Sequence, residues 1–403
     1  MIKRLPARLF PGILLPALLA ALLAGCVSPP GPLDQEPEVS GRFFEDPRQS
    51  NPQALLEARV APLVEEQRIP GFQLGITGPG QRIALAWGSE GPGRETPLTV
   101  NDQFRIGGVT ALYTSVILLS LVEEGRLSLE EPVSRWLPQL PGAEEITVAM
   151  LLQDESGLAA YSDATFDRLG HRLRPRRRWE PRAIYRRILR QTGRLEPGSL
   201  RGPNASNFHL LALLSEEVTG DSYSALLQRY IVSPLGLEKT SLPGGASPPG
   251  EPGRASAPPT DSPGSLLDGY EFRRSRSGAR IVERENRALS SWAWAAGGLV
   301  STAAEMSRFI AALFDGRLIS TELLEQELVE PALLREGGIG LRRVTVGGVA
   351  FVGNTGGMPG FEAFLLYSPE AQLAVAASAN RSEAGTELIL EAVVPLLAEG
   401  GGE

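Results

Sequence analysis

Cysteine, histidine and lysine are nearly absent from this chain of 403 residues. Its one cysteine, Cys26, excludes a disulfide within the chain and a cysteine-based metal site. Its two histidines, His171 and His209, exclude a three-histidine zinc site. We therefore expect no metal and no cofactor. The only lysines are Lys3 and Lys239, and every other basic side chain is arginine.

An excess of positive charge is also absent, since the formal net charge is −8. The first 25 residues contain three bases and no acid; removing those three from the 39 bases leaves 36 against 47 acids, or −11. Nucleic-acid phosphates attract a basic surface, so this balance predicts no nucleic-acid partner. One segment of this acidic chain is strongly basic: residues 172–194 contain ten arginines and a single acid, Glu180.

The N-terminal segment lacks an apolar run long enough to span a membrane comfortably, which takes about 20 residues. Its apolar run, Leu9–Leu23, is interrupted by two prolines and follows a basic start. Residues 22–26, Leu-Leu-Ala-Gly-Cys, resemble the bacterial lipobox, in which the peptidase cuts before a lipidated cysteine. We predict a lipoprotein signal peptide over residues 1–25, a lipid on Cys26, and a flexible, proline-rich tether over 26–52. The alternative is an ordinary secreted protein with an incidental cysteine.

The remaining residues, 53–399, have the composition and periodicity of one globular domain. Apolar spacing predicts helices over 53–67, 108–125, 206–219, 223–231, 303–314 and 387–398, with another beginning at 146–153. Short strands are predicted over 72–77 and 82–87, around a Gly-Pro-Gly turn, and strand-rich segments over 344–352 and 361–379. This order predicts an α+β fold with an antiparallel sheet built from both termini, about 53–110 and 290–399, flanked by helices. A mostly helical part, about 111–289, is inserted between them.

Seven stretches, in order, resemble the serine β-lactamase and penicillin-binding-protein superfamily, in its class C-like branch. They are Phe104–Gly107, Leu121–Leu129, Ile146–Leu158, Glu217–Gly220, Pro234–Leu237, Ala296–Thr302 and Thr355–Phe361. The resemblance runs from about Pro70 to the C-terminal helix. It implies a β-lactamase/transpeptidase-like fold and the chemistry of a serine hydrolase.

The groups that this chemistry requires are missing from the matching positions. The family's S-x-x-K, in which serine attacks a carbonyl and lysine takes its proton, falls on Gly108 and Ala111. Its Tyr-x-Asn falls on Pro203 and Ala205, and the lysine or histidine of its third motif falls on Asn354, followed by Thr355 and Gly356. A histidine that often precedes the Ser-Gly of the family is replaced by Asp154. The resemblance therefore implies a hydrolase frame without an intact catalytic residue.

Two other routes to catalysis remain open at this point. Thr110 lies near the start of the buried helix, where it would need Asp154 or Glu155 as its base; the alternative is that Thr110 is a packing or capping residue. A Ser-His-Asp triad would need His171 or His209, which are as well explained as surface and core residues. No G-x-S-x-G, phosphate loop or H-E-x-x-H is present.

A chain that has lost the catalytic side chains of the family can still bind a ligand, because the family holds its oxyanion with two backbone amides, which do not depend on side chains. Gly108 and Gly357 would present that pair, in a pocket that also includes Thr355 and Gly356; a closed pocket is the alternative. The sequence thus favours an inactive binding or scaffold protein of the bacterial cell envelope, at the inner or the outer membrane. The alternatives are an esterase, β-lactamase or D-Ala-D-Ala carboxypeptidase with residual activity, and a purely structural protein.

The expected partners follow from the anchor and from the arginine-rich segment. They are the membrane, through lipidated Cys26, and a peptidoglycan peptide or an envelope protein. A basic segment beside a lipid anchor also predicts contact with an anionic surface, with a solvated helix face as the alternative. The arginines concerned are Arg172, Arg174, Arg176, Arg177 and Arg178.

Overall fold

The computed structural model describes residues 52–161, 178–192, 194–199, 203–244, 266–275, 278–284, 289–330 and 341–398, all within one compact unit. The predicted signal peptide and tether, with Cys26, lie outside the described residues. So do His171 and four of the five named arginines, Arg172 to Arg177. Among the described residues, no helix combines the length and the apolarity needed to cross a membrane.

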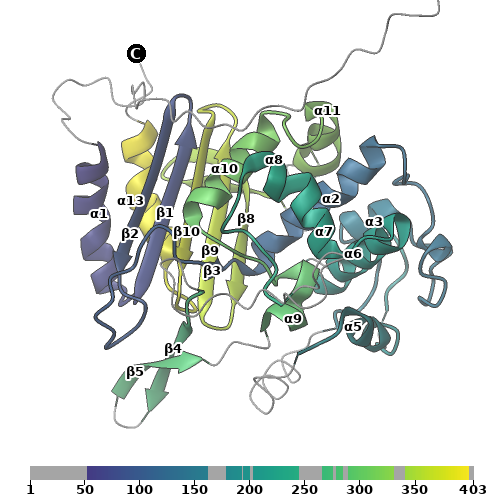
Figure 1. Cartoon of the computed structure of the whole chain (residues 1–403), viewed down its shortest axis with the longest axis horizontal. Helices are drawn as coiled ribbons and strands as arrows, with labels where there is room; N and C mark the ends of the chain where they lie inside the picture. Colours follow the sequence, from purple (N-terminus) through teal and green to yellow (C-terminus); the bar gives the residue numbers. More distant parts are fainter. Residues whose placement is uncertain are drawn as a thin grey trace, which may run out of the picture. The chain divides into compact units, whose positions relative to one another are not determined.

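A six-stranded sheet joins the two ends of the domain (Figure 1). Its order is β2-β1-β10-β9-β8-β7, and every neighbouring pair is antiparallel. The strands are β1 (Gly71–Gly78), β2 (Gln81–Gly88), β7 (Arg342–Val346), β8 (Val349–Met358), β9 (Phe361–Ser368) and β10 (Leu373–Ala379). Phe72 of β1 lies opposite Ala379 of β10, so N-terminal and C-terminal strands meet in the centre of the sheet. The predicted α+β fold, with its sheet built from both ends, is confirmed.

Both faces of the sheet are covered, which explains why its central strands are apolar at nearly every position. Helices α1 (Pro52–Glu66) and α13 (Thr386–Ala398) lie on one face, and α10 (Ala303–Phe314) lies on the other (Figure 1). Along β10, Val375 belongs to the apolar core beneath α1 and α13, and Ala376 belongs to the apolar core that includes α10. At Gly75 of β1, an added Cβ would lie 2.2 Å from the carbonyl oxygen of Ala303. Only glycine at that position lets α10 approach the sheet so closely.

The inserted part of the chain surrounds one buried helix, α2 (Thr110–Glu123). Every residue of α2 from Thr110 to Leu121 is buried, as its uninterrupted apolar sequence predicts. Helices α6 (Ala205–Thr219) and α7 (Tyr223–Leu227) pack against α2. The other helices described are α3 (Val148–Leu152), α5 (Pro181–Ile188), α8 (Ser233–Leu235), α9 (Leu289–Ala293) and α11 (Thr321–Leu324). Short 3-10 or π turns are η1 (Gly107–Val109), η2 (Val133–Arg135), η3 (Gln228–Val232), η4 (Trp294–Ala296) and η5 (Glu325–Val329).

The segment 344–352, predicted to be strand-rich, contains parts of the two strands β7 and β8, because Gly347 and Gly348 adopt positive φ and turn the chain between them. The structure corrects two predicted helices. The helix predicted to begin at Ile146 begins at Val148, because Thr147 caps it by accepting a hydrogen bond from Met150 N. The helix predicted over 223–231 ends in the π turn η3.

Strands also occur where a helical part was predicted. A two-stranded hairpin, β4 (Gly269–Ser275) and β5 (Gly278–Arg284), extends beyond the large sheet in Figure 1. A second small sheet, in the two parts predicted to be sheet, pairs β3 (Phe104–Arg105) with β6 (Val300–Ser301). These strands are too short, or too polar, for their periodicity to distinguish them from loop.

Candidate functional site

The start of α2 lies against strand β8, at the positions that the resemblance assigns to the first and third motifs. A Cβ added to Gly108 would lie 3.2 Å from the carbonyl oxygen of Thr355. The side chain of Asn354 bridges the two elements, because its Nδ2 donates to Gly108 O (3.2 Å) and its Oδ1 accepts from Thr355 N (2.7 Å). We call Gly107, Gly108 and Asn354–Gly357 the glycine corner.

Glycine is required at two positions of this corner. Gly107 has a φ of +52°, a left-handed conformation that other residues rarely adopt. At Gly356 an added Cβ would lie 2.0 Å from the carbonyl oxygen of Ile106, so a side chain there would force the sheet and η1 apart. At Gly357, by contrast, an added Cβ meets nothing within 4 Å. The corner is therefore tightly packed at Gly356 and open at Gly357.

No residue of the glycine corner carries a titratable side chain. The nearest cation along the chain is Arg105, which is 5% exposed and donates to Ser290 Oγ, while its Nε has no hydrogen-bond partner. Burial lowers the pKa of Arg105 to about 10, and the charge of Asp268 opposes that shift. Arg105 thus stays cationic at neutral pH. The corner offers backbone amides just before a 14-residue helix, a position that favours anionic groups, and Thr355 supplies its one side-chain hydroxyl.

The hydroxyl groups of α2 have structural partners. Thr110 is fully buried, and its Oγ1 accepts a hydrogen bond from Leu299 N (3.2 Å). Ser115 and Ser120 donate to the carbonyls of Ala111 and Val116, four residues earlier in the helix. Ala111 itself is 7% exposed and presents only a methyl group. This geometry favours packing as the role of Thr110.

The second-motif positions form the start of α6. Pro203 is exposed and Ala205 is the first residue of the helix, while Asn204 between them is its buried N-cap. The side chain of Asn204 accepts from Ser206 N (2.9 Å) and donates to Leu158 O (2.7 Å). Among the described residues, no hydrogen bond joins Pro203 or Ala205 to the glycine corner. The side chains at these two positions therefore contribute no functional group.

Asp154 supports the same helix start. Its Oδ1 accepts from Asn207 Nδ2 (2.6 Å) and from Asn204 N (3.3 Å). Ser156 Oγ donates to the Asn207 side chain (2.6 Å), so the loop around Gly157 is tied to α6 through buried polar groups. With these bonds, Asp154 acts as a structural acceptor, and nothing in its described contacts directs it toward Thr110.

His209 lies in the aromatic core of the inserted part. It is fully buried, and its Nε2 bonds the carbonyl of Pro181 (3.0 Å), which makes Nε2 the donor. Its ring packs against Tyr161 and Trp294. Burial lowers the pKa of His209 to about 3, so the imidazole is neutral at physiological pH. Its described contacts are those of a core histidine and give no support to a triad.

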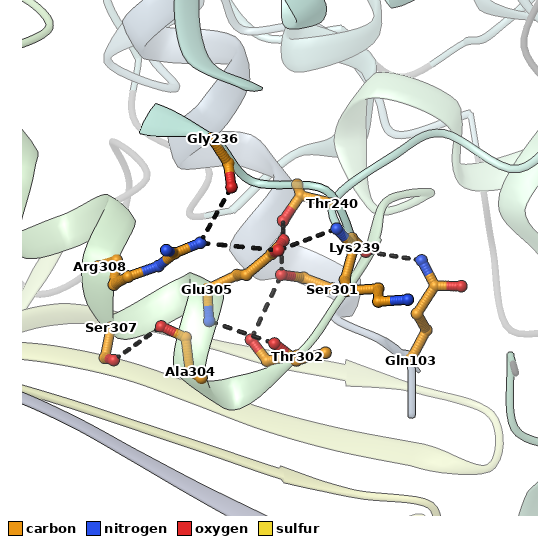
Figure 2. A network of polar contacts seen from close by, with 10 residues as sticks. All are labelled: Gln103, Gly236, Lys239, Thr240, Ser301, Thr302, Ala304, Glu305, Ser307 and Arg308. Atoms are coloured by element: carbon orange, nitrogen blue, oxygen red, sulfur yellow. Dashed lines mark hydrogen bonds and ion pairs between the residues drawn. The ribbon is translucent and has the colours of Figure 1, made fainter. Parts of the chain in front are cut away.

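A buried carboxylate, Glu305 of α10, was not identified from the sequence (Figure 2). Its Oε1 accepts from Lys239 N (2.9 Å) and its Oε2 from Thr240 Oγ1 (2.6 Å). Burial raises the pKa of Glu305, and these two hydrogen bonds oppose that shift. The only signal in the sequence was the Thr302-x-x-Glu305 pattern of a capped helix, and Thr302 does accept from Glu305 N (3.2 Å).

The same network accounts for Lys239, the one lysine outside the N-terminal segment. Its backbone N–H bonds Glu305, and its backbone carbonyl accepts from Gln103 Nε2 (2.6 Å) (Figure 2). Lys239 thus joins the chain after α8 to α10 through its backbone. Among the residues that the structure describes, no group of three histidine, cysteine or acidic side chains is arranged to hold a metal ion.

The described half of the arginine-rich segment forms α5 and its flanks. Arg182, Arg186 and Arg190 are exposed and lie four residues apart, on one stripe of the helix. Arg182 is paired with Glu217, and Arg187 instead donates to Tyr161 O (2.6 Å). Arg178 is exposed just before α5. Arg182 and Arg187 are therefore bound to other groups of the fold, whereas Arg186 and Arg190 stay exposed to solvent.

Comparison with known proteins matches residues 56–398 to the family model described as Beta-lactamase. A β-lactamase of Pseudomonas fluorescens is 22% identical over 191 residues, which cover 47% of this chain and 50% of that protein. The D-alanyl-D-alanine-carboxypeptidase/endopeptidase AmpH of Escherichia coli (strain K12) is 28% identical over 180 residues, which cover 42% of this chain and 45% of AmpH. The chain thus spans about half the length of these curated relatives.

Solved structures of similar proteins share the fold over most of the chain. A D-amino acid amidase from Ochrobactrum anthropi SV3 has a TM-score of 0.71 and 22% identity, covering 88% of this chain and 100% of the amidase chain. An octameric penicillin-binding protein homologue from Pyrococcus abyssi has a TM-score of 0.68 and 22% identity, covering 86% of this chain and 77% of that chain. At such identities the likeness concerns the architecture.

Proposed function

This chain belongs to the β-lactamase family, and from that premise we propose that it is a catalytically inactive member that binds an envelope ligand. The observation that carries the proposal is the glycine corner. Gly108 and Ala111 stand where the family's nucleophile and base are expected, and Asn354 stands where its third motif has a cation. Without a nucleophile and a base, the acyl-enzyme chemistry of the family has no first step.

Binding is supported by what the corner retains. The side of Gly357 is open, the backbone amides at the start of α2 favour an anionic or carbonyl oxygen, and the buried cation Arg105 precedes them by a few residues. The names of two relatives, a D-alanyl-D-alanine-carboxypeptidase and a D-amino acid amidase, suggest the ligand class. We propose a short peptide or amide of D-amino acids, such as the stem peptide of peptidoglycan.

Residual hydrolysis is the alternative, and one experiment separates the two. The mature protein is incubated with a chromogenic cephalosporin, a p-nitrophenyl ester and a fluorescent penicillin, and binding of D-alanyl-D-alanine is followed by NMR in parallel. We expect saturable binding of the dipeptide without turnover and without a covalent adduct. Turnover, or an adduct that survives denaturation, would show that the protein is an enzyme.

We further propose that a lipid on Cys26 anchors the protein to the bacterial cell envelope. The support is the lipobox-like sequence around the one cysteine of the chain. Cys26→Ala should abolish labelling by a radioactive fatty acid and leave an uncleaved precursor. A normally cleaved, soluble product of that variant would contradict the anchor.

The arginines at 172–178 add a second proposed contact, with an anionic surface. Replacing Arg172, Arg174 and Arg176 by glutamine should weaken sedimentation of the unlipidated protein with phosphatidylglycerol vesicles. The same change in the exposed arginines Arg59 and Arg68, remote in sequence, should leave sedimentation unchanged. Equal effects of the two sets would indicate a general charge effect.

A further inference from the structure

A pocket of about 130 Å³ opens in the inserted part of the chain. Its wall comes from the start of α5, from the facing ends of α6 and α7, from residues 242–244 and from the α9–η4 segment. No residue of the glycine corner lines it. A cavity of roughly 150 Å³ holds one benzene molecule, so this pocket has room for a small ligand or for one end of a larger one.

Aromatic rings supply much of the pocket wall. Trp179, Tyr223 and Trp294 all contribute. The Tyr223 hydroxyl is hydrogen-bonded to Thr114 Oγ1 (2.7 Å), and the ring centroids of Tyr223 and Trp294 are 5.4 Å apart. The ring of Trp179 packs against Trp292 at 4.8 Å. These contacts fix the rings, and fixed aromatic faces attract a cation from which water has been removed.

A carboxylate completes the wall. Glu216 is partly buried, and its Oε1 accepts from Tyr223 N (2.8 Å), which leaves the second carboxylate oxygen without a hydrogen bond from any described residue. Burial raises the pKa of Glu216, and the hydrogen bond from Tyr223 N and the charge of Arg182 oppose that shift. Arg182, the nearest cation to influence it, is already ion-paired with Glu217.

The charges of the lining set the sign of the ligand. Arg178, Glu180 and Glu216 are the charged residues that line the pocket, and they sum to −1. The Arg178 guanidinium lies against Gly244, where an added Cβ would be 3.2 Å from its Nη2, and the residue is exposed. The positive charge therefore lies at the rim of the pocket, beside residues 242–244.

We propose that this pocket binds a primary ammonium group, with the aromatic rings around the cation and Glu216 as its hydrogen-bonded counter-charge. The ligand class is an alkylamine, or the aminoalkyl end of a larger molecule. An anion would meet the Glu216 carboxylate, and a neutral alcohol of the same size would lose both the charge pairing and the cation–π attraction. This proposal does not depend on the proposed function, since the pocket and the glycine corner share no residue.

The experiment compares n-butylammonium chloride, n-butanol and sodium butyrate at constant ionic strength. Binding to the folded protein is followed through the indole N–H signals of Trp179 and Trp294 in ¹H–¹⁵N spectra. We expect a saturable shift of both signals with butylammonium and none with butyrate. Glu216→Gln keeps an acceptor for Tyr223 N but removes the charge, and it should weaken butylammonium binding at least about tenfold.

Glu57→Gln is the control, because Glu57 is an exposed carboxylate of α1 that does not line the pocket and leaves the Arg182–Glu217 ion pair intact. It should leave butylammonium binding unchanged. Trp179→Leu, which removes an aromatic face and keeps an apolar side chain, should weaken binding severalfold and provides the test if Glu216→Gln does not fold. The proposal is overturned if butanol or butyrate binds as well as butylammonium. It is equally overturned if no ligand gives a saturable shift, or if the two glutamate variants lose the same affinity.

Discussion

The glycine corner and the Glu305 network are built in opposite ways. The corner is held by close backbone packing and by one neutral side chain, Asn354, that bridges α2 and β8. The Glu305 network uses a buried carboxylate, with two hydrogen bonds to the chain after α8. A charged side chain is thus present where it joins elements of the scaffold, and none is present in the glycine corner, where we propose that the family's reactive groups would lie. The comparison implies that changes at the network will alter stability and changes at the corner will alter binding or reactivity.

The largest effect is expected at the network. Glu305→Ala leaves Lys239 N without its acceptor and leaves Thr240 Oγ1 with Ser301 Oγ alone as partner, and the loss of these buried bonds to a carboxylate should lower the free energy of unfolding by about 3 kcal/mol. Urea unfolding followed by circular dichroism measures this loss. Glu325→Ala, at an exposed position, should change it by less than about 0.5 kcal/mol. Equal losses in the two variants would remove the distinction between network and surface.

A second effect should appear on acidification, again away from the corner. Burial lowers the pKa of His209 from 6.5 to about 3, so between these values the unfolded chain binds a proton that the folded protein does not. Stability should therefore fall as the pH drops through this window, by about 2 kcal/mol between pH 7 and pH 4.5 from this residue. His209→Gln, which keeps a donor for Pro181 O, should show a correspondingly smaller fall in urea titrations. An identical pH dependence of both proteins would contradict the assignment.

At the corner a smaller change in stability is expected. Asn354→Ala removes both bonds of a partly buried amide and should lower the free energy of unfolding by about 1 kcal/mol. Because the Asn354 bridge fixes β8 against Gly108, the variant should also bind D-alanyl-D-alanine differently, as measured by NMR. Asn101→Ala, at an exposed position, is the control and should change neither quantity. A loss at Asn354 as large as that at Glu305 would mean that the corner is part of the stabilising scaffold.

The smallest expected signal is restored reactivity. Gly108→Ser with Ala111→Lys would place a hydroxyl-bearing side chain against Thr355 and Gly356 of β8 and a desolvated amine one turn later. Acylation by a reactive penicillin should be slow, because the new Cβ would lie 3.2 Å from Thr355 O and would push β8 outward by a few tenths of an ångström. Mass spectrometry should find one adduct, at position 108. Gly108→Ala with Ala111→Lys should remain unlabelled, and a folded Ser/Lys variant without an adduct would show that the corner is closed.

Long elements with a clear apolar pattern were predictable, while short or glycine-rich ones were not. The buried helix α2, the strands β1 and β2 and the helix α10 lie close to their predicted bounds, because burial of a helix or sheet face leaves a direct mark on residue choice. The turn at Gly347–Gly348 was not located within the strand-rich segment 344–352, since glycine gives no sign of the φ that it will adopt. The hairpin of β4 and β5 was missed within a part predicted to be helical.

The sequence by itself determined which residue types this chain has at each position. It has one lysine beyond the N-terminal segment and two histidines, and it has Gly108, Ala111 and Asn354 where we propose that the family's reactive groups would lie. Only the tertiary structure decided what those residues contact. Asn354 bonds Gly108 across 246 positions of sequence, and Glu216 comes to lie in a pocket with Trp179 and Trp294. Such contacts depend on how distant elements pack, and local sequence patterns carry little information about packing at that range.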